Sequence, residues 1–138
     1  MVELEVVRVA YEAGGDHAVV LLHDGAGGRV LPILVGQSEG GAIALALQGV
    51  EPPRPQTHDL LKQILDRLGV SVAGVLIDDV RDETFFAQIS LSTPNGLLEI
   101  DSRPSDAIAL AVRAKAPIRA LERVLEVAGV SADEGPVH

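Results

Sequence analysis

The stretch E-I-D-S-R-P-S-D-A-I-A-L-A-V-R, from Glu99 to Arg113, decides how this fold is interpreted. It continues an apolar strand that starts near Leu97, and it then packs acids, an arginine and hydroxyls into a few residues before an apolar run. Pro104 has no backbone N–H and a fixed φ, so it suits the first turn of a helix. Asp106 falls where a carboxylate can cap free N–H groups and meet the positive helix end. The stretch therefore predicts a strand, a charged turn and a helix ending near Ala114.

The composition indicates a soluble cytoplasmic domain with an aliphatic core. At 138 residues the chain fits one domain, which we place at residues 1–130, with a flexible acidic tail at 131–138. The absence of Cys excludes disulfides, thiolate nucleophiles and Cys-ligated zinc, and it agrees with a reducing compartment. No signal-like segment is visible, and no apolar run approaches the ~20 residues that span a bilayer. We expect no membrane partner.

Charge argues against a broad nucleic-acid surface. The net charge is −9, Lys62 and Lys115 are the only lysines, and the other nine cations are arginines. Non-specific affinity for polyanions comes from cations that neutralise phosphates, and aromatic side chains for base stacking are scarce. Nucleic acid is thus possible as a partner but opposed by the net charge. Any anion site must be local, and arginine favours forked hydrogen bonds there.

Hydrophobic patterning and turn residues predict the elements in order. Ser38 and Thr57 are the expected N-caps of the first two helices, and Gly25 to Gly28 is interpreted as a hairpin loop because it lacks the lysine and helix of a phosphate-binding loop. The helix after Thr57 carries an apolar stripe opposite polar residues. The predicted strands are 2–9, 17–23, 29–35, 70–79, 84–91 and 97–100, and the predicted helices are 39–48, 57–68, 104–114 and one ending at 129.

The two halves of the chain resemble each other. A-I-A-L-A-L at 42–47 parallels A-I-A-L-A-V at 107–112, and each half is predicted as strand, strand, strand, helix, helix. We therefore expect an α+β fold of two tandem βββαα repeats, residues 1–69 and 70–130, forming one domain with a mixed or antiparallel sheet. Superposing the halves sets Ser38 against Arg103 and Gly41 against Asp106. The second copy thus carries charge that the helix start itself does not require.

Three pieces together resemble the bifunctional nuclease (BFN) domain family: L-P-I-L-V-G-Q-S-E-G-G-A-I-A-L-A-L at 31–47, R-P-Q-T-H-D-L at 54–60 and I-D-S-R-P-S-D-A-I-A-L-A-V-R-A-K-A-P-I at 100–118. The resemblance implies an α+β fold, a homodimer, and nuclease activity on DNA and RNA of the kind assigned to plant members. Gly40, Gly41 and Ser102 depart from the alanines that the family more often has. The polar motif residues are Glu39, Arg54, His58, Asp59, Asp101, Arg103, Ser105, Asp106 and Arg113.

The resemblance implies roles for these residues, and two interpretations of them stay open. In the first, the acids converge on Mg²⁺ or Mn²⁺, which would activate water. In the second, which we favour, the arginines pair with the acids as a structural network around the helix starts. The residues assigned to catalysis are His58, Asp59, Asp101 and Asp106; those assigned to substrate binding are Arg54, Arg103, Ser105 and Arg113; and those assigned to metal are Glu39, Asp101 and Asp106.

Single residues leave further alternatives. His58 beside Asp59 could be a general base, but a surface or capping histidine is the preferred interpretation because neighbours at a helix start point in different directions. Ser105 lacks the G-x-S-x-G surroundings of a nucleophile. The leading functional hypothesis is a nuclease that hydrolyses phosphodiester bonds in DNA or RNA. The alternative is a non-catalytic dimeric module that binds a small anion or a protein partner, with dimers formed through apolar helix or strand-edge surfaces.

Overall fold

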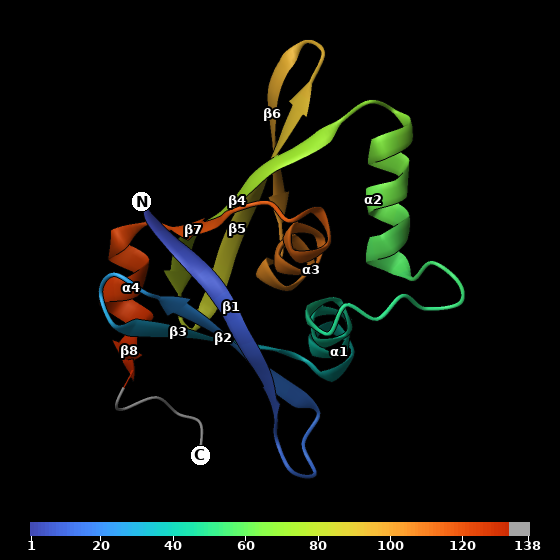
Figure 1. The fold of residues 1–138 in the computed structure, drawn as a ribbon. Helices are drawn as coiled ribbons and strands as arrows, with labels where there is room; N and C mark the ends of the chain where they lie inside the picture. The colour runs from blue at the N-terminus through green and yellow to red at the C-terminus, as the bar shows by residue number, and fades with distance from the viewer. Residues whose placement is uncertain (133–138) are drawn as a thin grey trace.

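The fold is α+β, as predicted, with four helices against one mixed eight-stranded sheet (Figure 1). The computed structural model describes residues 1–132. In that part of the chain no helix is long and apolar enough to cross a membrane. The elements in order are β1 (Val2–Tyr11), β2 (His17–Asp24), β3 (Arg29–Gly36), α1 (Gln37–Leu47), α2 (Thr57–Arg67), β4 (Ser71–Arg81), β5 (Thr84–Thr93), β6 (Gly96–Ser102), α3 (Pro104–Ala114), β7 (Ile118–Ala120), α4 (Glu122–Ala128) and β8 (Val130–Ser131).

The sheet joins both halves of the chain in the order β6-β5-β4-β7-β1-β2-β3-β8. Each half contributes an antiparallel meander, β1-β2-β3 and β4-β5-β6. Strand β7 lies between the meanders, parallel to β4 and antiparallel to β1. It is three residues long, which is why its sequence carried too little periodicity to be predicted. A strand of the second half therefore ties the first half into the same sheet.

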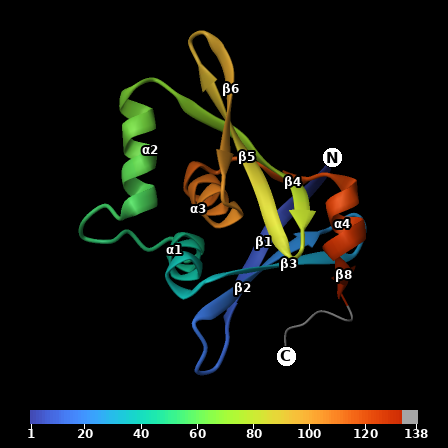
Figure 2. The same ribbon diagram turned by 180° about the vertical axis from the view of Figure 1, so that it is seen from behind.

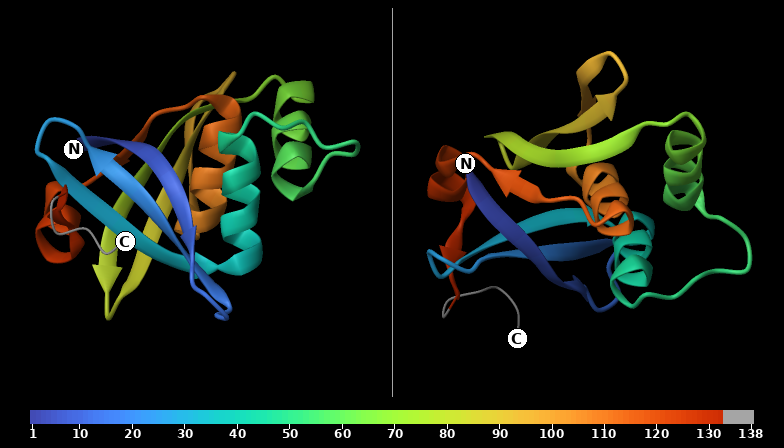
Figure 3. Two further views of the ribbon diagram at one scale, coloured as in Figure 1. Left: turned by 60° about the horizontal axis from the view of Figure 1, so that its bottom comes forward. Right: turned by 45° about the horizontal axis from the view of Figure 1, so that its top comes forward.

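Helices α1 and α3 form a layer against the sheet, and α4 packs against two of its strands. Helices α1 and α3 pack against each other, with α1 on β1, β2 and β3 and α3 on β4 and β5 (Figures 1 and 2). Helix α4 contacts both β4 and β3, which are not neighbours in the sheet, so the sheet curves around it (Figure 3). The core between them is aliphatic, as composition indicated. Its largest fully buried side chains are Val20, Leu22, Leu31, Ile33, Ile43, Ile77, Ile108, Val124 and Leu125.

Helix boundaries were predicted well in the second half and less well in the first. The prediction of a helix from Pro104 to Ala114 is confirmed. The predicted N-caps Ser38 and Thr57 are wrong, because the N-cap residues are Gly36 and Gln56, so Ser38 and Thr57 already lie inside α1 and α2. The predicted tail starts too early, since Ser131 belongs to β8, and residues 133–138 lie outside the described chain.

The second helix of each half is placed differently. Helix α4 buries Val124 and Leu125 against the sheet. Helix α2 packs chiefly against α3, and its apolar stripe is largely exposed; Leu68, for example, is 68% accessible. Both halves do follow the order βββαα, with β7 and β8 added in the second. Their origin by tandem duplication stays a prediction.

Candidate functional site

The charged turn before α3 forms a bridge to α2 instead of a cap for α3. Arg103 is the N-cap residue, with extended backbone at φ −66° and ψ 144°, and Pro104 occupies the first helical position as predicted. The expected capping by Asp106 is not observed, because its carboxylate accepts side-chain hydrogen bonds. His58 Nε2 lies 2.9 Å from Asp106 Oδ1, and Arg103 Nε donates to Oδ2 at 2.9 Å.

His58 is buried, which corrects the preference for a surface or capping histidine. It lies in the first turn of α2, and only 9% of its side chain is exposed. Its Asp106 partner comes from a position 48 residues later in the chain. Within residues 1–132 the other ring nitrogen, Nδ1, has no hydrogen-bond partner. The neighbouring Asp59 points to a different partner, as expected for adjacent residues on a helix.

A second bridge holds three helices together through Arg113. Its Nε donates to Asp59 Oδ1 at 2.7 Å, Nη1 donates to the carbonyl of Ala109 at 2.9 Å, and Nη2 donates to the carbonyl of Ala42 at 3.1 Å. The Arg113 side chain is only 10% exposed. Asp59 also accepts the backbone N–H of Gln56 at 2.9 Å, which closes the start of α2. The Arg113–Asp59 pair is one part of the arginine–acid network that the sequence favoured, whereas Arg54 and Asp101, which were also expected in it, have no ion pair within residues 1–132.

The remaining candidates lie around this network or apart from it. Glu39, in the first turn of α1, is 3.8 Å from Arg103 Nη1. Arg103 is 64% exposed and has donors left for a ligand. Asp101 lies on β6 and Arg54 in the loop before α2, and both are exposed, with no side-chain hydrogen bond or ion pair within residues 1–132. The paired strand positions set Asp101 opposite Gln88, on the sheet face away from the buried side chains.

The electrostatics keep the two bridging acids ionised. Partial burial would raise the pKa of Asp106, but the hydrogen bonds from Arg103 and His58 outweigh it, so the pKa lies below its ordinary value. Burial opposes ionisation of Asp59 in the same way, and hydrogen bonds from the Gln56 N–H and Arg113 lower its pKa overall. The pKa of Arg103 is raised by its hydrogen bond to Asp106. Both acids are therefore carboxylates at neutral pH.

The donor set does not fit a metal ion held by the protein alone. Among the described residues, no three His, Asp or Glu side chains are grouped closely enough to hold one. The predicted metal ligands Glu39, Asp101 and Asp106 are thus not brought together. Both oxygens of Asp106 are already engaged by His58 and Arg103.

A cavity of 400 Å³ lies beside the charged turn. It is bordered by Arg103, Ser105 and Glu39 of the predicted set, and Ser105 is buried at its wall. The turn between β4 and β5 also contributes through Glu83, and the start of β5 contributes Thr84 and Phe85. Sequence spacing gave no signal for these three residues, because only the tertiary fold brings the β4–β5 turn and the start of β5 close to the start of α3.

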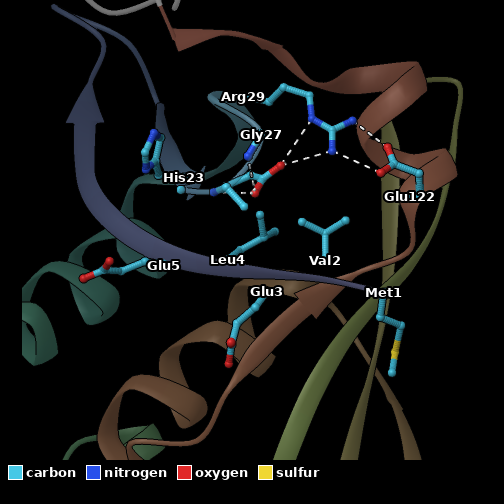
Figure 4. A pocket seen from close by; sticks show the side chains of 12 residues that line it. Met1, Val2, Glu3, Leu4, Glu5, His23, Gly27, Arg29 and Glu122 are labelled. Atoms are coloured by element: carbon cyan, nitrogen blue, oxygen red, sulfur yellow. Dashed lines mark hydrogen bonds and ion pairs between the residues drawn. The ribbon is translucent and has the colours of Figure 1, made fainter.

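A larger cavity of 790 Å³ lies away from the motif residues, between β1, the β2–β3 turn and α4 (Figure 4). Arg29 spans its wall, with ion pairs to Asp24 at 3.1 Å and to Glu122. Asp24 accepts the backbone N–H groups of Ala26 and Gly27 at 3.1 and 3.0 Å. The hairpin interpretation of residues 25–28 is confirmed, and the N–H groups of Ala26, Gly27 and Gly28 donate to Asp24 within the turn.

Comparison with known proteins agrees with the motif resemblance. A family model described as the bifunctional nuclease domain matches residues 20–133. An uncharacterized protein of Mycobacterium tuberculosis is 43% identical over 130 residues, which is 94% of this chain and 77% of that protein. Bifunctional nuclease 1 of Arabidopsis thaliana is 35% identical over 105 residues, and bifunctional nuclease 1 of Oryza sativa subsp. japonica is 29% identical over 111 residues.

The plant relatives are much longer than the matched region. The alignments cover 74% and 78% of this chain but only 32% and 34% of the Arabidopsis and rice proteins. The chain therefore spans about a third of the length of the plant nucleases that it matches. The match to the family model nevertheless takes in both charged helix starts and the three motif pieces. The chain belongs to the bifunctional nuclease domain family.

Proposed function

We propose that this protein hydrolyses phosphodiester bonds in DNA or RNA, with His58 and Asp106 as its acid–base pair. The observation that carries the proposal is the 2.9 Å contact between His58 Nε2 and an ionised Asp106, which come from two of the motif pieces that resemble the family. A carboxylate bonded to one ring nitrogen fixes the tautomer and orientation of the imidazole. Nδ1 is then the nitrogen that can take a proton from water.

The neighbouring arginine supplies the phosphate contact in this proposal. Arg103 uses Nε to hold Asp106, and its side chain is 64% exposed, so its terminal nitrogens can reach a phosphate. Arg54 is a second exposed guanidinium within the motifs. Arg113, by contrast, donates to three acceptors of the protein, so in this proposal it positions α2 and does not contact substrate.

A metal ion is a separate part of the proposal. Mg²⁺ is commonly bound through one or two carboxylates together with substrate phosphates, so assistance by Mg²⁺ or Mn²⁺ would require the nucleic acid to complete the site. Hydrolysis measured with each metal and with a chelator tests this point. Activity that survives chelation would assign the chemistry to the side chains alone.

The test of the activity compares variants purified in the same way. We expect wild-type protein to cleave labelled single-stranded DNA and RNA, and His58→Ala to lose about 10²- to 10⁴-fold, the usual contribution of acid–base catalysis. Asp16→Asn is the matched control, because Asp16 is exposed before β2 and is not one of the motif residues. Equal rates in wild type and His58→Ala would show that the activity is a contaminant and would contradict the proposal.

The second candidate function is a non-catalytic module that binds a small anion or a protein partner. It is favoured by the pairing of Asp59, Asp106 and Glu39 with Arg113 and Arg103, which gives each acid a structural role. On this account His58→Ala weakens folding but abolishes no reaction. Inactive wild-type protein that still binds inorganic phosphate by calorimetry would support it.

A further inference from the structure

Two cavities beside the charged turn are continuous and form one groove. The 400 Å³ cavity at the start of α3 and a second cavity of 410 Å³ share the lining residues Leu34, Glu83 and Phe85. These residues come from both sides of the groove, which runs between β3 and the tip of the β4–β5 hairpin (Figure 2). We call it the Phe85 groove, and it extends from Arg103 to Val127 of α4. Each cavity falls within the roughly 300 to 1,000 Å³ of small-molecule sites.

One end of the groove is polar and has an unused hydroxyl. Ser105 is only 6% exposed, and its hydroxyl has no hydrogen-bond partner within residues 1–132. Because no fully buried side-chain oxygen of the described chain is left without a partner, this hydroxyl opens on the cavity that Ser105 lines. The first residues of α1 and α3 border the same cavity through Gly36 and Pro104, and Arg103 adds a guanidinium. Helix N-terminal ends and arginine both favour an anion such as phosphate.

The charges at the polar end favour a phosphate diester over a monoester. Arg103 is shared between Asp106, 2.9 Å from its Nε, and Glu39, 3.8 Å from its Nη1. A monoester carries about two negative charges at neutral pH, whereas each linkage of a nucleic-acid strand carries one. Repulsion from the two acids therefore selects an internal phosphate of a strand over a free nucleotide.

The rest of the groove is apolar and contains one aromatic ring. Phe85 is half-buried where the two cavities meet, and the apolar side chains of Leu34 and Val127 are 58% and 73% exposed. Unstacked bases of single strands stack on aromatic side chains. A ring in an apolar slot beside a phosphate site is the combination that one nucleotide unit of a strand fits.

Glu83 adds a carboxylate beside this ring from a strained turn. Asp82 and Glu83 form the turn between β4 and β5, with φ values of 48° and 68° that favour glycine or asparagine. Non-glycine residues kept in such a conformation cluster at functional sites. The Glu83 side chain has no hydrogen bond or ion pair within residues 1–132, so both of its oxygens can accept from a ligand.

We propose that the Phe85 groove binds one nucleotide unit of a single strand and prefers guanine. The phosphate lies against Arg103 and Ser105, the base stacks on Phe85, and the Glu83 carboxylate accepts the two neighbouring N–H donors on the Watson–Crick edge of guanine. Adenine, cytosine and thymine each present one donor group on that edge beside an acceptor, which a carboxylate repels. The choice of a nucleic acid rests on the proposed function; the base preference and the residues that read the base go beyond it.

The experiment measures binding by fluorescence anisotropy and needs no hydrolysis. Its probes are short labelled strands of thymidine with one central guanine, adenine, cytosine or thymine, joined by phosphorothioate linkages that keep the charge and resist cleavage. We expect wild type to bind the guanine strand at least about 5-fold more tightly than the others, the lower end of the discrimination that a bidentate base contact gives. Equal binding of the four strands would overturn the proposal.

Substitutions of Glu83 separate base recognition from strain in the turn. Glu83→Gln offers one donor and one acceptor, the pattern that suits adenine, so the preference should move from guanine to adenine. Glu83→Gly should abolish the preference and raise the denaturant midpoint of unfolding, because glycine adopts this turn without strain. A guanine preference that persists in Glu83→Gly would exclude Glu83 as the base-reading residue.

The stacking contact is tested with two neighbouring rings. Phe85→Leu keeps an apolar wall but removes the ring, so all four strands should bind at least about 5-fold more weakly. Phe86→Leu is the matched control, because alternation along β5 puts Phe86 on the other face of the sheet, where the Arg81 guanidinium lies 4.7 Å from its ring centre. Equal losses in the two variants would contradict stacking on Phe85.

Failure of this inference can be told apart from failure of the nuclease proposal. Guanine-selective binding by a protein that hydrolyses nothing would support the groove and remove the activity. Hydrolysis with no base preference in binding would overturn the groove assignment alone. Tighter binding of dodecyl phosphate, below its micellar concentration, than of any strand would assign the groove to an amphiphile and also overturn the nucleotide assignment.

Discussion

The starts of α1 and α3 make the same strand-to-helix turn with opposite chemistry. Before α1 the chain reads Gly36-Gln37-Ser38, and α1 packs against the sheet through Gly40, where an added Cβ would meet Ala18 at 2.8 Å. Before α3 it reads Asp101-Ser102-Arg103, and the following Asp106 holds His58 and Arg103. The difference teaches that charge is not needed to make the turn. At the start of α3 the charge ties α2 to α3 through Asp106, and in the proposed function it also serves the reaction.

The largest loss of stability should come from removing the buried guanidinium of Arg113, which lies in α3; α1 carries no arginine. Arg113→Ala leaves Asp59 and two helix carbonyls without their partner, so we expect a loss of about 3 to 5 kcal/mol in the free energy of unfolding. Denaturant unfolding measures it. Lys62→Ala, which breaks the exposed pair with Asp66, should change stability by only about 0.3 to 0.5 kcal/mol. Similar losses in both variants would contradict the network.

Two neighbouring glycines test how closely the start of α1 packs against the sheet. Gly40→Ala forces a methyl group against Ala18 and Val9, and we expect a loss of about 1 to 3 kcal/mol. At Gly41 the nearest atom to a new Cβ is the Tyr11 hydroxyl at 4.0 Å, so Gly41→Ala should gain about 0.5 to 1 kcal/mol from helix propensity. Denaturant unfolding curves of the two variants measure both changes in the free energy of unfolding. Gains in both would mean that α1 does not press against the sheet there.

Low pH should weaken the contacts between α2 and α3, because these contacts depend on the ionised carboxylates of Asp59 and Asp106. The pKa values of Asp59 and Asp106 are lowered on folding, so these groups contribute stability above the unfolded pKa of about 4, and it is lost as pH falls through their folded pKa values. Between neutral pH and about pH 3, Asp59→Asn should therefore show a shallower fall in denaturant midpoint than wild type. Asp16→Asn, in the exposed β1–β2 turn, should follow the wild-type curve.

The smallest effect on stability is expected at Arg103. Its side chain is 64% exposed, and exposed ion pairs contribute about 0 to 1 kcal/mol, so Arg103→Gln should unfold nearly like wild type. If it binds phosphate as proposed, the same variant should raise KM for oligonucleotide hydrolysis more than it lowers kcat. A large loss of stability would mean that Arg103 is structural.

Local patterns in the sequence were enough to predict the fold class and most elements. Alternation and turn residues marked the six long strands, and Pro104 marked the start of α3 to the residue. Short β7 and β8 have no period to detect, although β7 joins the meanders. The stripe on α2 has the same amphipathic signal as a core helix, so periodicity could not reveal that it stays exposed.

The candidate site was predicted as a set of residues but not as contacts. Motif resemblance brought together His58, Asp59, Arg103, Asp106 and Arg113, and the structure joins all five through two bridges. The structure also places Asp101 apart from these five residues, because alternation along β6 puts its side chain on the opposite face of the sheet. Which acid meets which cation depends on how α1, α2 and α3 pack together. That packing is set by contacts far apart in the sequence.

The central claim is that the charge before α3 serves a reaction and not the turn. Giving α3 a start like that of α1 tests it most directly, with Arg103→Ser matching Ser38 and Asp106→Ala avoiding the glycine of position 41. We predict that this double variant folds, with a loss of about 1 to 3 kcal/mol from the unpaired His58, and that its hydrolysis of a labelled oligonucleotide falls to background. Wild-type hydrolysis by the folded double variant would contradict the claim.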